Sequence, residues 1–280
     1  MPPTSLRFAA ALALALGATS AAAQETVCSA TITALPATIT VPGTYCLKTS
    51  LSTSAITGAA VSIESDDVTV DLKGFALDGP AVPTAFTIGV RALERRHVTV
   101  RNGTVRGFQV GVLLQSTAAE PAFFAVERVR AVENTNVGLR VAGAGHNVVR
   151  DNSVLSTGGF DNAIPACIGI DVTGAGSRVE NNLVSGLVAC PSGGTRAAIQ
   201  VSSCVGCVVQ GNELLSGTVL GSSEGVLVLS ADVLVADNRV TRFATGLSFT
   251  AGAASSRYRD NLTVGCLLAF SGGTNAGNNQ

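Results

Sequence analysis

The sequence predicts an all-β protein, a single-stranded right-handed parallel β-helix of about eight coils. Three observations predict it: a glycine-led phrase that recurs along the chain, an asparagine at a constant distance after each later copy, and the composition. Only 13% of the residues are charged, 46% are hydrophobic and 31 are glycine. Low charge with abundant glycine and small or aliphatic residues is typical of chains built from many short strands and tight turns.

The N-terminus has the pattern of an export signal. A basic residue is followed by an apolar run over 8–17 and then by small residues that end in three alanines. We therefore expect a signal peptide over 1–23, an N-terminal cap segment over 24–58 and a β-helix domain over 59–280. The apolar run is shorter than the roughly 20 residues that cross a bilayer. We expect a secreted or periplasmic protein with no membrane span.

The recurring phrase is a glycine, an aliphatic residue, any residue, and then an aliphatic or small residue. Successive copies start 21 to 31 residues apart, which is the period of a solenoid. In one copy alanine replaces the glycine. The copies begin at Gly89, Gly111, Gly138, Gly169, Ala198, Gly225 and Gly246.

An asparagine follows each later copy, three positions after an aliphatic or aromatic residue. The interval from the opening glycine or alanine to this asparagine is 13 to 15 residues, so the insertions fall in the other half of each coil. Coils stack about 4.8 Å apart, which would let each inward amide hydrogen-bond to its neighbours as in other asparagine ladders. We expect this structural ladder at Asn152, Asn182, Asn212, Asn238 and Asn261.

A leucine-rich repeat is the main alternative, because its period and its aliphatic-x-x-Asn element are similar. That fold needs a helix or 3₁₀ turn between its strands. The intervening segments here, such as 142–145 and 202–206, are rich in glycine and serine and break helices. A solenoid of strands is therefore favoured.

The charge pattern argues against nucleic acid as a partner. The formal net charge is −1, and the only lysines are Lys48 and Lys73. A phosphate-binding surface needs clustered basic residues, whereas the arginines are dispersed.

Three segments, 42–47 (Pro-Gly-Thr-Tyr-Cys-Leu), 68–75 (Val-Thr-Val-Asp-Leu-Lys-Gly-Phe) and 97–103 (His-Val-Thr-Val-Arg-Asn-Gly), together with the aliphatic-x-x-Asn phrases, resemble bacterial right-handed β-helix repeat proteins of the pectate-lyase-like superfamily. The resemblance covers residues 26–280. It implies the fold but not an activity, since the superfamily includes lyases, hydrolases, epimerases and non-catalytic members.

The resemblance implies that the glycine-led strand belongs to the sheet that lines a polysaccharide groove. Its side chains alternate with period two, and the outward positions form a column whose middle is polar. We expect the centre of the groove at Arg140, Asp171 and Gln200. The full column is Ser62, Arg91, Leu113, Arg140, Asp171, Gln200, Leu227 and Ser248.

Long insertions at 155–166 and 186–197 flank these strands and supply Asp161 and Arg196. We predict catalytic roles for Asp171 and Arg140 if the protein is an enzyme. The predicted substrate-binding residues are Gln200, Asp161, Arg196 and Arg91.

The chemistry of this column is limited by its carboxylates. Elimination of the pectate-lyase type uses several carboxylates on Ca²⁺ with a basic residue, and glycoside hydrolysis uses two carboxylates at a set separation. Only Asp171 falls on the outward face, so no metal site is predicted, and Ca²⁺ would be a cofactor only in a lyase. The alternative is an exposed ion pair between Arg140 and Asp171, worth about 0–1 kcal/mol.

Two histidines occupy equivalent turn positions. His97 and His146 each fall eight residues after a repeat glycine, two coils and roughly 10 Å apart. That is too far for both to bind one metal ion, so exposed turn histidines are expected.

The seven cysteines are interpreted as disulfides of an exported protein. Cys28 and Cys46 bracket the segment that should cover the first coil, and we expect them to be bonded. A local Cys204–Cys207 disulfide and a Cys167–Cys190 pair would leave Cys266 as the odd thiol. Pairing of Cys190 with Cys204 or Cys207 is the alternative.

Two classes of function follow. The first is a protein that binds, and in an enzyme also processes, an extended polysaccharide or cell-surface glycan along the groove. The enzyme would then be a polysaccharide lyase, glycoside hydrolase or epimerase. The second is a non-catalytic envelope or surface module with a structural or adhesive role, which the scarcity of groove carboxylates favours.

Overall fold

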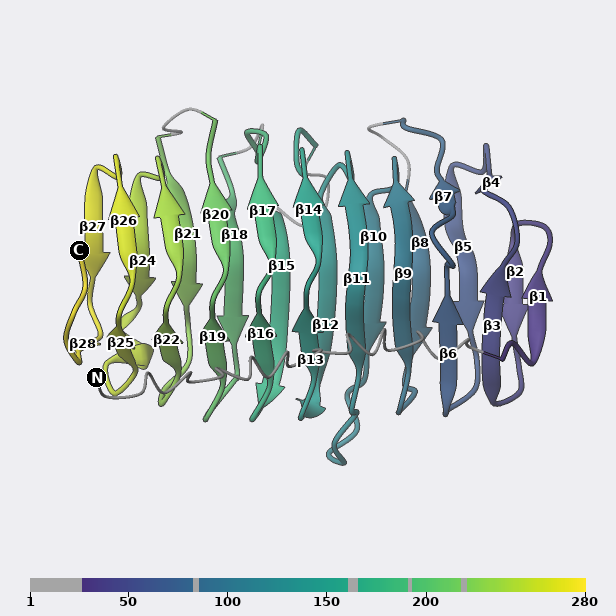
Figure 1. The fold of residues 1–280 in the computed structure, drawn as a ribbon, viewed down its shortest axis with the longest axis horizontal. Helices are drawn as coiled ribbons and strands as arrows, with labels where there is room; N and C mark the ends of the chain where they lie inside the picture. Colours follow the sequence, from purple (N-terminus) through teal and green to yellow (C-terminus); the bar gives the residue numbers. More distant parts are fainter. Residues whose placement is uncertain (1–26, 83–85, 161–165, 191–192, 218–220) are drawn as a thin grey trace, which may run out of the picture.

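The computed structural model describes residues 27–82, 86–160, 166–190, 193–217 and 221–280. These residues form a stack of turns made almost entirely of parallel strands, with purple N-terminal turns at one end and yellow C-terminal turns at the other (Figure 1). The expected right-handed parallel β-helix is confirmed. It has about nine turns, one more than the sequence predicts. The predicted signal peptide lies outside the described residues.

One wall of the solenoid is a ten-stranded parallel sheet, here called sheet B, in which each turn contributes one strand. Its strands lie behind those of the other sheet in Figure 1. In order they are β2 (Ala37–Ile39), β5 (Thr57–Ile63), β8 (Phe86–Leu93), β10 (Val110–Gln115), β12 (Val137–Gly145), β15 (Ala166–Ala175), β18 (Thr195–Ser202), β21 (Ser223–Val228), β24 (Thr245–Phe249) and β27 (Leu268–Ser271).

The other wall is an eighteen-stranded parallel sheet, here called sheet A, which bends along its length. The later turns contribute two short strands each, one on either side of the bend. A 3₁₀ turn, η1 (Ala251–Ala253), precedes β25. The strands of sheet A are β1 (Ala30–Ile32), β3 (Gly43–Leu47), β4 (Leu51–Ser52), β6 (Val68–Asp71), β7 (Ala76–Asp78), β9 (Thr99–Arg106), β11 (Ala125–Val132), β13 (Val148–Arg150), β14 (Ser153–Leu155), β16 (Arg178–Glu180), β17 (Leu183–Ser185), β19 (Val208–Gln210), β20 (Glu213–Leu215), β22 (Leu234–Ala236), β23 (Arg239–Thr241), β25 (Arg257–Arg259), β26 (Leu262–Val264) and β28 (Thr274–Asn275).

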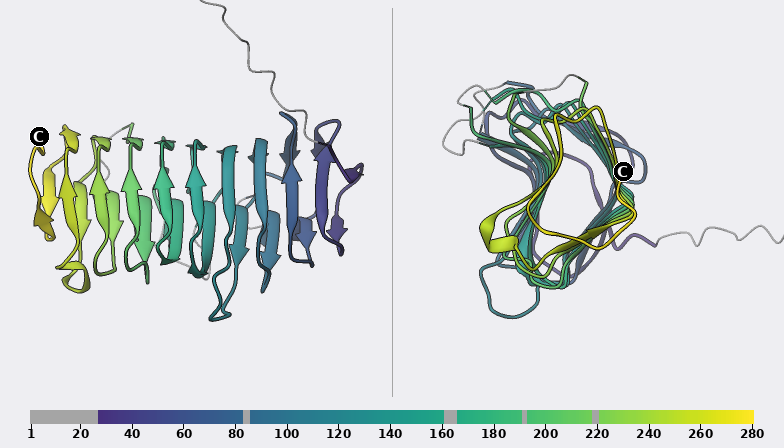
Figure 2. Two further views of the ribbon diagram at one scale, coloured as in Figure 1. Left: turned by 60° about the horizontal axis from the view of Figure 1, so that its bottom comes forward. Right: turned by 90° about the vertical axis from the view of Figure 1, so that its left-hand side faces the viewer.

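The segment predicted as an N-terminal cap contains β1 to β4, and these strands already pair with the next turn. β3 pairs with β6, and β2 pairs with β5. Viewed along the axis, the turns superimpose except where loops project from them (Figure 2). The core fills the space between the walls with valine, isoleucine, leucine and phenylalanine side chains, as the aliphatic phrases predict.

The predicted asparagine ladder is confirmed at the bend of sheet A. Each Asn side-chain oxygen accepts hydrogen bonds from the backbone N and the side-chain amide of the preceding Asn, as between Asn152 and Asn182 at 3.0 Å. The same pattern runs through Asn212, Asn238 and Asn261, and the five side chains are 1–2% exposed. Because the amides satisfy each other, the ladder holds the bend without leaving a buried polar group unpaired.

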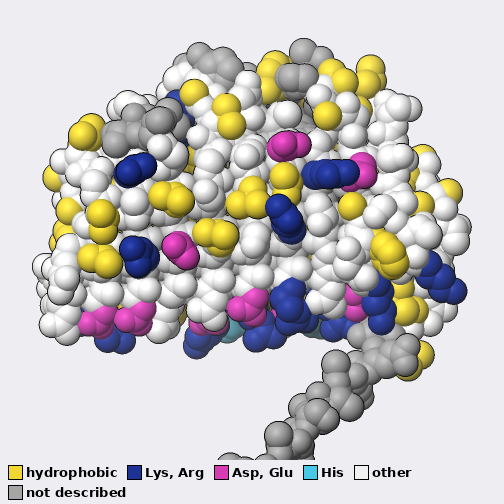
Figure 3. Space-filling model, turned by 45° about the horizontal axis from the view of Figure 1, so that its top comes forward, with side chains coloured by type: hydrophobic (Ala, Val, Ile, Leu, Met, Phe, Trp, Pro, Cys, Tyr) yellow, Lys and Arg dark blue, Asp and Glu magenta, His cyan; other side chains and the backbone are white. Residues whose placement is uncertain are grey.

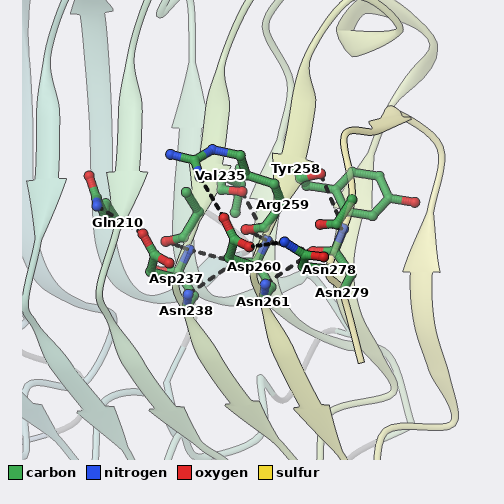
Figure 4. A network of polar contacts seen from close by, with 12 residues as sticks. Gln210, Val235, Asp237, Asn238, Tyr258, Arg259, Asp260, Asn261, Asn278 and Asn279 are labelled. Atoms are coloured by element: carbon green, nitrogen blue, oxygen red, sulfur yellow. Dashed lines mark hydrogen bonds and ion pairs between the residues drawn. The ribbon is translucent and has the colours of Figure 1, made fainter.

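The ladder has one more rung than the sequence predicts. Asn279 accepts from the side-chain amide of Asn261 at 3.1 Å and donates to the backbone oxygen of Tyr258 at 3.2 Å (Figure 4). At the other end β9 and β11 continue through the bend as single strands, with Asn102 and Arg128 at positive φ there. Asn102, which the sequence places one residue early, instead donates to the Asp71 carboxylate at 3.2 Å.

The repeat glycines are needed because the two walls approach closely there. A Cβ atom built at Gly169 would lie 2.6 Å from the backbone oxygen of Ala198 and 2.6 Å from the Val184 side chain of sheet A. The missing side chain therefore faces the interior. From Ile170 onward the period-two alternation follows as predicted, with Ile170 and Val172 in the core and Asp171 in the outward row.

The cysteines pair as expected, in three disulfides. These join Cys28 to Cys46, Cys167 to Cys190 and Cys204 to Cys207, and Cys266 is the free thiol. The alternative pairing of Cys190 with the Cys204–Cys207 segment is therefore wrong.

Candidate functional site

The predicted outward column exists as one row across sheet B. In register, Arg140 of β12 lies beside Asp171 of β15, and Asp171 lies beside Gln200 of β18. The row continues through Leu113 and Leu227 on either side of this group. Parallel pairing without a register shift at these positions explains why the repeat spacing predicts the row.

Asp171 is the centre of the group. Its carboxylate lies 3.5 Å from the Arg140 Nε and accepts a hydrogen bond from the Gln200 amide at 3.3 Å. The Arg140 contact has the length of an ion pair, but Nε is not aligned for a hydrogen bond. The Asp171 side chain is 6% exposed and that of Arg140 is 31% exposed. The carboxylate is thus deeply set although it belongs to the outward row.

Burial raises the pKa of Asp171 above its ordinary value, while the Arg140 charge and the Gln200 hydrogen bond lower it and only partly offset the effect. Removing water from a carboxyl group favours its neutral form. A buried carboxyl with a shifted pKa and a specific charge partner is a common feature of functional sites, although structural ion pairs show it too.

Asp171→Asn is expected to raise the stability of the protein at pH 7. Because the pKa is raised in the folded state, the unfolded chain loses this proton first as the pH rises above 3.8, and folding stability falls through that window. Asparagine does not ionise, so it removes the free-energy cost of a buried carboxylate. The difference in stability between the two proteins disappears below the ordinary pKa of the aspartate. Melting temperatures of both proteins from pH 3 to pH 7 test this. A variant that melts lower than the original at pH 7 would show that the ionised carboxylate stabilises the fold.

The other predicted binding residues lie apart from this group. Arg91 of β8 is two strands from Arg140, and it bonds to the Ser62 hydroxyl at 3.2 Å and lies 3.7 Å from Glu64. Arg196 is in register with Cys167 and Ser223 and is only 7% exposed. Asp161 lies outside the described residues. Their predicted roles stay predictions.

Sequence reasoning missed a second carboxyl group on the same wall. Glu224 of β21 is in register with Ala197, in a row that is aliphatic at Ile88, Val110, Val137 and Ile168 and polar again at Thr245. Burial raises the pKa of Glu224. The signal was present in the sequence, because Glu224 is the one charged residue immediately before a repeat glycine, where the other copies have an aliphatic residue or, before Gly246, a threonine.

The described residues do not fit a Ca²⁺ site. None of them forms a group of three or more His, Cys, Asp or Glu side chains able to hold a metal ion. Asp171, the carboxylate of the central group, is already engaged by Arg140 and Gln200. Ca²⁺ prefers six to eight oxygen ligands, which this arrangement does not supply.

The two turn histidines flank an aromatic ring that sequence reasoning missed. Phe123 lies between them, with ring centroids 5.4 Å from His97 and 5.5 Å from His146. His97 also contacts the Asp67 carboxylate at 2.9 Å. The intervening ring keeps the two imidazoles apart, in agreement with the expectation that they do not share a metal ion.

The sequence matches no protein-family model and no curated protein. Solved structures with a similar fold include an alginate lyase from Paenibacillus sp., with a TM-score of 0.46 and 10% identity over 85% of this chain and 92% of the lyase. The enzymatically active domain of tailspike protein 2 of bacteriophage CBA120 has a TM-score of 0.48 and 10% identity, over 87% of this chain and 41% of that one. The tailspike of E. coli bacteriophage HK620, solved with a hexasaccharide, has a TM-score of 0.42 and 11% identity, over 87% and 52%. Such low similarity does not transfer activity, ligands or site residues.

No helix among the described residues is long and apolar enough to cross a membrane. Disulfides persist in oxidising compartments, and the three described here agree with the predicted export.

Proposed function

We propose that this protein is exported and binds an extended glycan along the outward face of sheet B, with Arg140, Asp171 and Gln200 as the central contacts. The observation that carries the proposal is the polar row itself. Three side chains that can form hydrogen bonds occur in register on adjacent turns, between apolar neighbours at Leu113 and Leu227.

A ligand that lies along the solenoid axis meets this row turn by turn. Arg140 offers donors to carboxylate or hydroxyl oxygens, and its side chain is accessible at 31%. The Gln200 amide has both donor and acceptor atoms, while its bond to Asp171 orients it. A repeating polymer with hydroxyl groups matches a repeating row of this kind, whereas a compact ligand would contact one turn.

Binding is better supported than turnover. Hydrolysis uses two carboxyl groups about 5–9.5 Å apart. Asp171 and Glu224 are separated by two strand spacings and three residues along the strand, which places their backbones about 14 Å apart. A catalytic role for Asp171 and Arg140 stays a prediction that the same experiment tests.

Arg140→Ala and Gln200→Ala are each expected to weaken glycan binding about tenfold, since each removes a polar contact worth roughly 1–2 kcal/mol. The purified protein would be screened against immobilised acidic and neutral polysaccharides, and the affinity for each one bound would then be measured for the variants. Gln210→Ala is the matched control, because Gln210 is a polar residue of β19 on sheet A, away from this row.

Unchanged affinity in both variants would contradict this location of the site. Failure of the folded protein to bind any glycan would contradict the proposal and favour the structural or adhesive module. New double bonds, detected by ultraviolet absorbance on a uronate polymer, would show elimination and overturn the binding-only assignment.

A further inference from the structure

A second polar surface lies on sheet A, on the opposite wall from the glycan row. It is a hollow of about 310 Å³ on the outward side of β7, β9 and β11, lined by Ser50, Asp78, Thr104, Arg106 and Arg130 with two apolar residues. Figure 3 shows charged side chains collected in a band along one edge of the molecule, while the broad face above it is mostly uncharged with a few isolated charges.

Register brings the two arginines of the hollow together. Arg130 of β11 pairs with Thr104 of β9, and Arg106 lies two residues further along β9. Residues on adjacent strands that are offset by two are diagonal neighbours about 7–8 Å apart, within reach of long side chains. Both guanidinium groups therefore border the same space, with the Thr104 side chain beside them.

The two arginines differ in their ion pairs and hydrogen bonds. The Arg106 guanidinium makes two hydrogen bonds with the Asp78 carboxylate, at 2.7 and 3.2 Å, and Glu133 adds a weaker electrostatic attraction. Arg130 has no ion pair or side-chain hydrogen bond with any described residue. The Asp78 pair holds Arg106 in place, whereas the Arg130 guanidinium is free to bind a ligand that enters the hollow.

We propose that this hollow binds an oxyanion, either the carboxylate of a uronic acid or a sulfate or phosphate group, with Arg130 as the principal contact. The planar guanidinium donates two parallel hydrogen bonds to such a group. Arg106 and the Thr104 hydroxyl supply further donors at its rim. The site does not depend on the glycan row, because it lies on a different sheet.

The site is open to solvent, which limits its affinity. The Arg106 side chain is 54% exposed, and salt screens interactions between exposed charges. Binding in the millimolar range that weakens as the ionic strength rises is expected.

The test is a nuclear magnetic resonance titration of the full protein that follows the Hε–Nε signals of the arginines. The probes are sodium glucuronate, sodium sulfate and sodium phosphate, with glucose as the neutral comparison, all at constant ionic strength. The Arg130 and Arg106 signals are expected to shift with one or more of the anions and not with glucose. The anion that binds most tightly distinguishes a uronate from a sulfate or phosphate ligand.

Arg130→Gln is expected to weaken that binding at least tenfold, because hydrogen bonds to charged groups are the stronger class. Arg130→Lys should retain part of the binding, since lysine keeps the positive charge but lacks the two parallel donors of the guanidinium group. Arg239→Gln is the matched control, because Arg239 occupies the same outward row of sheet A four turns away. Equal effects of Arg130→Gln and Arg239→Gln, or no saturable shift with any anion, would overturn the proposal.

Discussion

Replacing Asn182 with alanine is expected to lower the free energy of unfolding by about 2–4 kcal/mol. The Asn182 side-chain oxygen accepts from the backbone N and the side-chain amide of Asn152, both at 3.0 Å. Its own amide donates to the backbone oxygen of Val149 and to Asn212, both at 2.9 Å. Alanine leaves these partners without their hydrogen bonds at a position that is 1% exposed. An unpaired polar group that is buried in this way costs about 1–3 kcal/mol.

The melting temperature measures this loss, which should amount to roughly 4–16 °C for a chain of this size. Asn279→Ala is the comparison within the same ladder. Asn279 is half-buried at the last rung, so water can replace its bonds and a loss of only about 1 kcal/mol is expected. Equal losses in the two variants would mean that burial of the ladder does not determine its contribution.

Replacing Gly169 with valine is expected to cost about 3 kcal/mol or more. The added Cβ would stand 2.6 Å from the Ala198 backbone oxygen and 2.6 Å from the Val184 side chain. The first of these atoms belongs to the backbone of the next turn, which can move only by disturbing sheet pairing. Equilibrium unfolding in denaturant, read by circular dichroism, measures the cost.

Ala198→Gly is the matched control for this position. Ala198 is the alanine copy of the repeat phrase and its methyl group is fully buried, so this turn already accommodates a Cβ. Removing it should cost no more than about 1 kcal/mol, mainly through backbone entropy. A Gly169→Val protein as stable as the original would show that the walls separate freely at the repeat glycines.

The row at the centre of the proposed glycan site was predictable because it follows from repeat position. Asp171 and Gln200 each stand two residues after the opening residue of their copies, so parallel pairing in register must place them side by side. The burial of Asp171 could not be predicted in the same way. It depends on side chains of the neighbouring turns, among them Arg140 and Gln200.

The hollow around Arg130 also depends on contacts between turns that the sequence does not reveal. The sequence shows several dispersed arginines but no basic cluster, because Arg106 and Arg130 are 24 positions apart. Pairing of β9 with β11 makes them diagonal neighbours, and Asp78 of an earlier turn neutralises one of them. Contacts between turns decide which of the two arginines forms an ion pair within the described residues and which does not.

The sequence by itself determined the solenoid, the interior asparagine column and the order of the outward row. Each of these repeats a local pattern at a nearly constant interval, and a repeated pattern can stack in only one register. Only the tertiary structure decided which side chains pair across turns, which carboxyl groups lose their water, and where two walls come too close for a side chain. Those properties arise between residues that the chain separates by a whole turn, and strand pairing between turns brings them together.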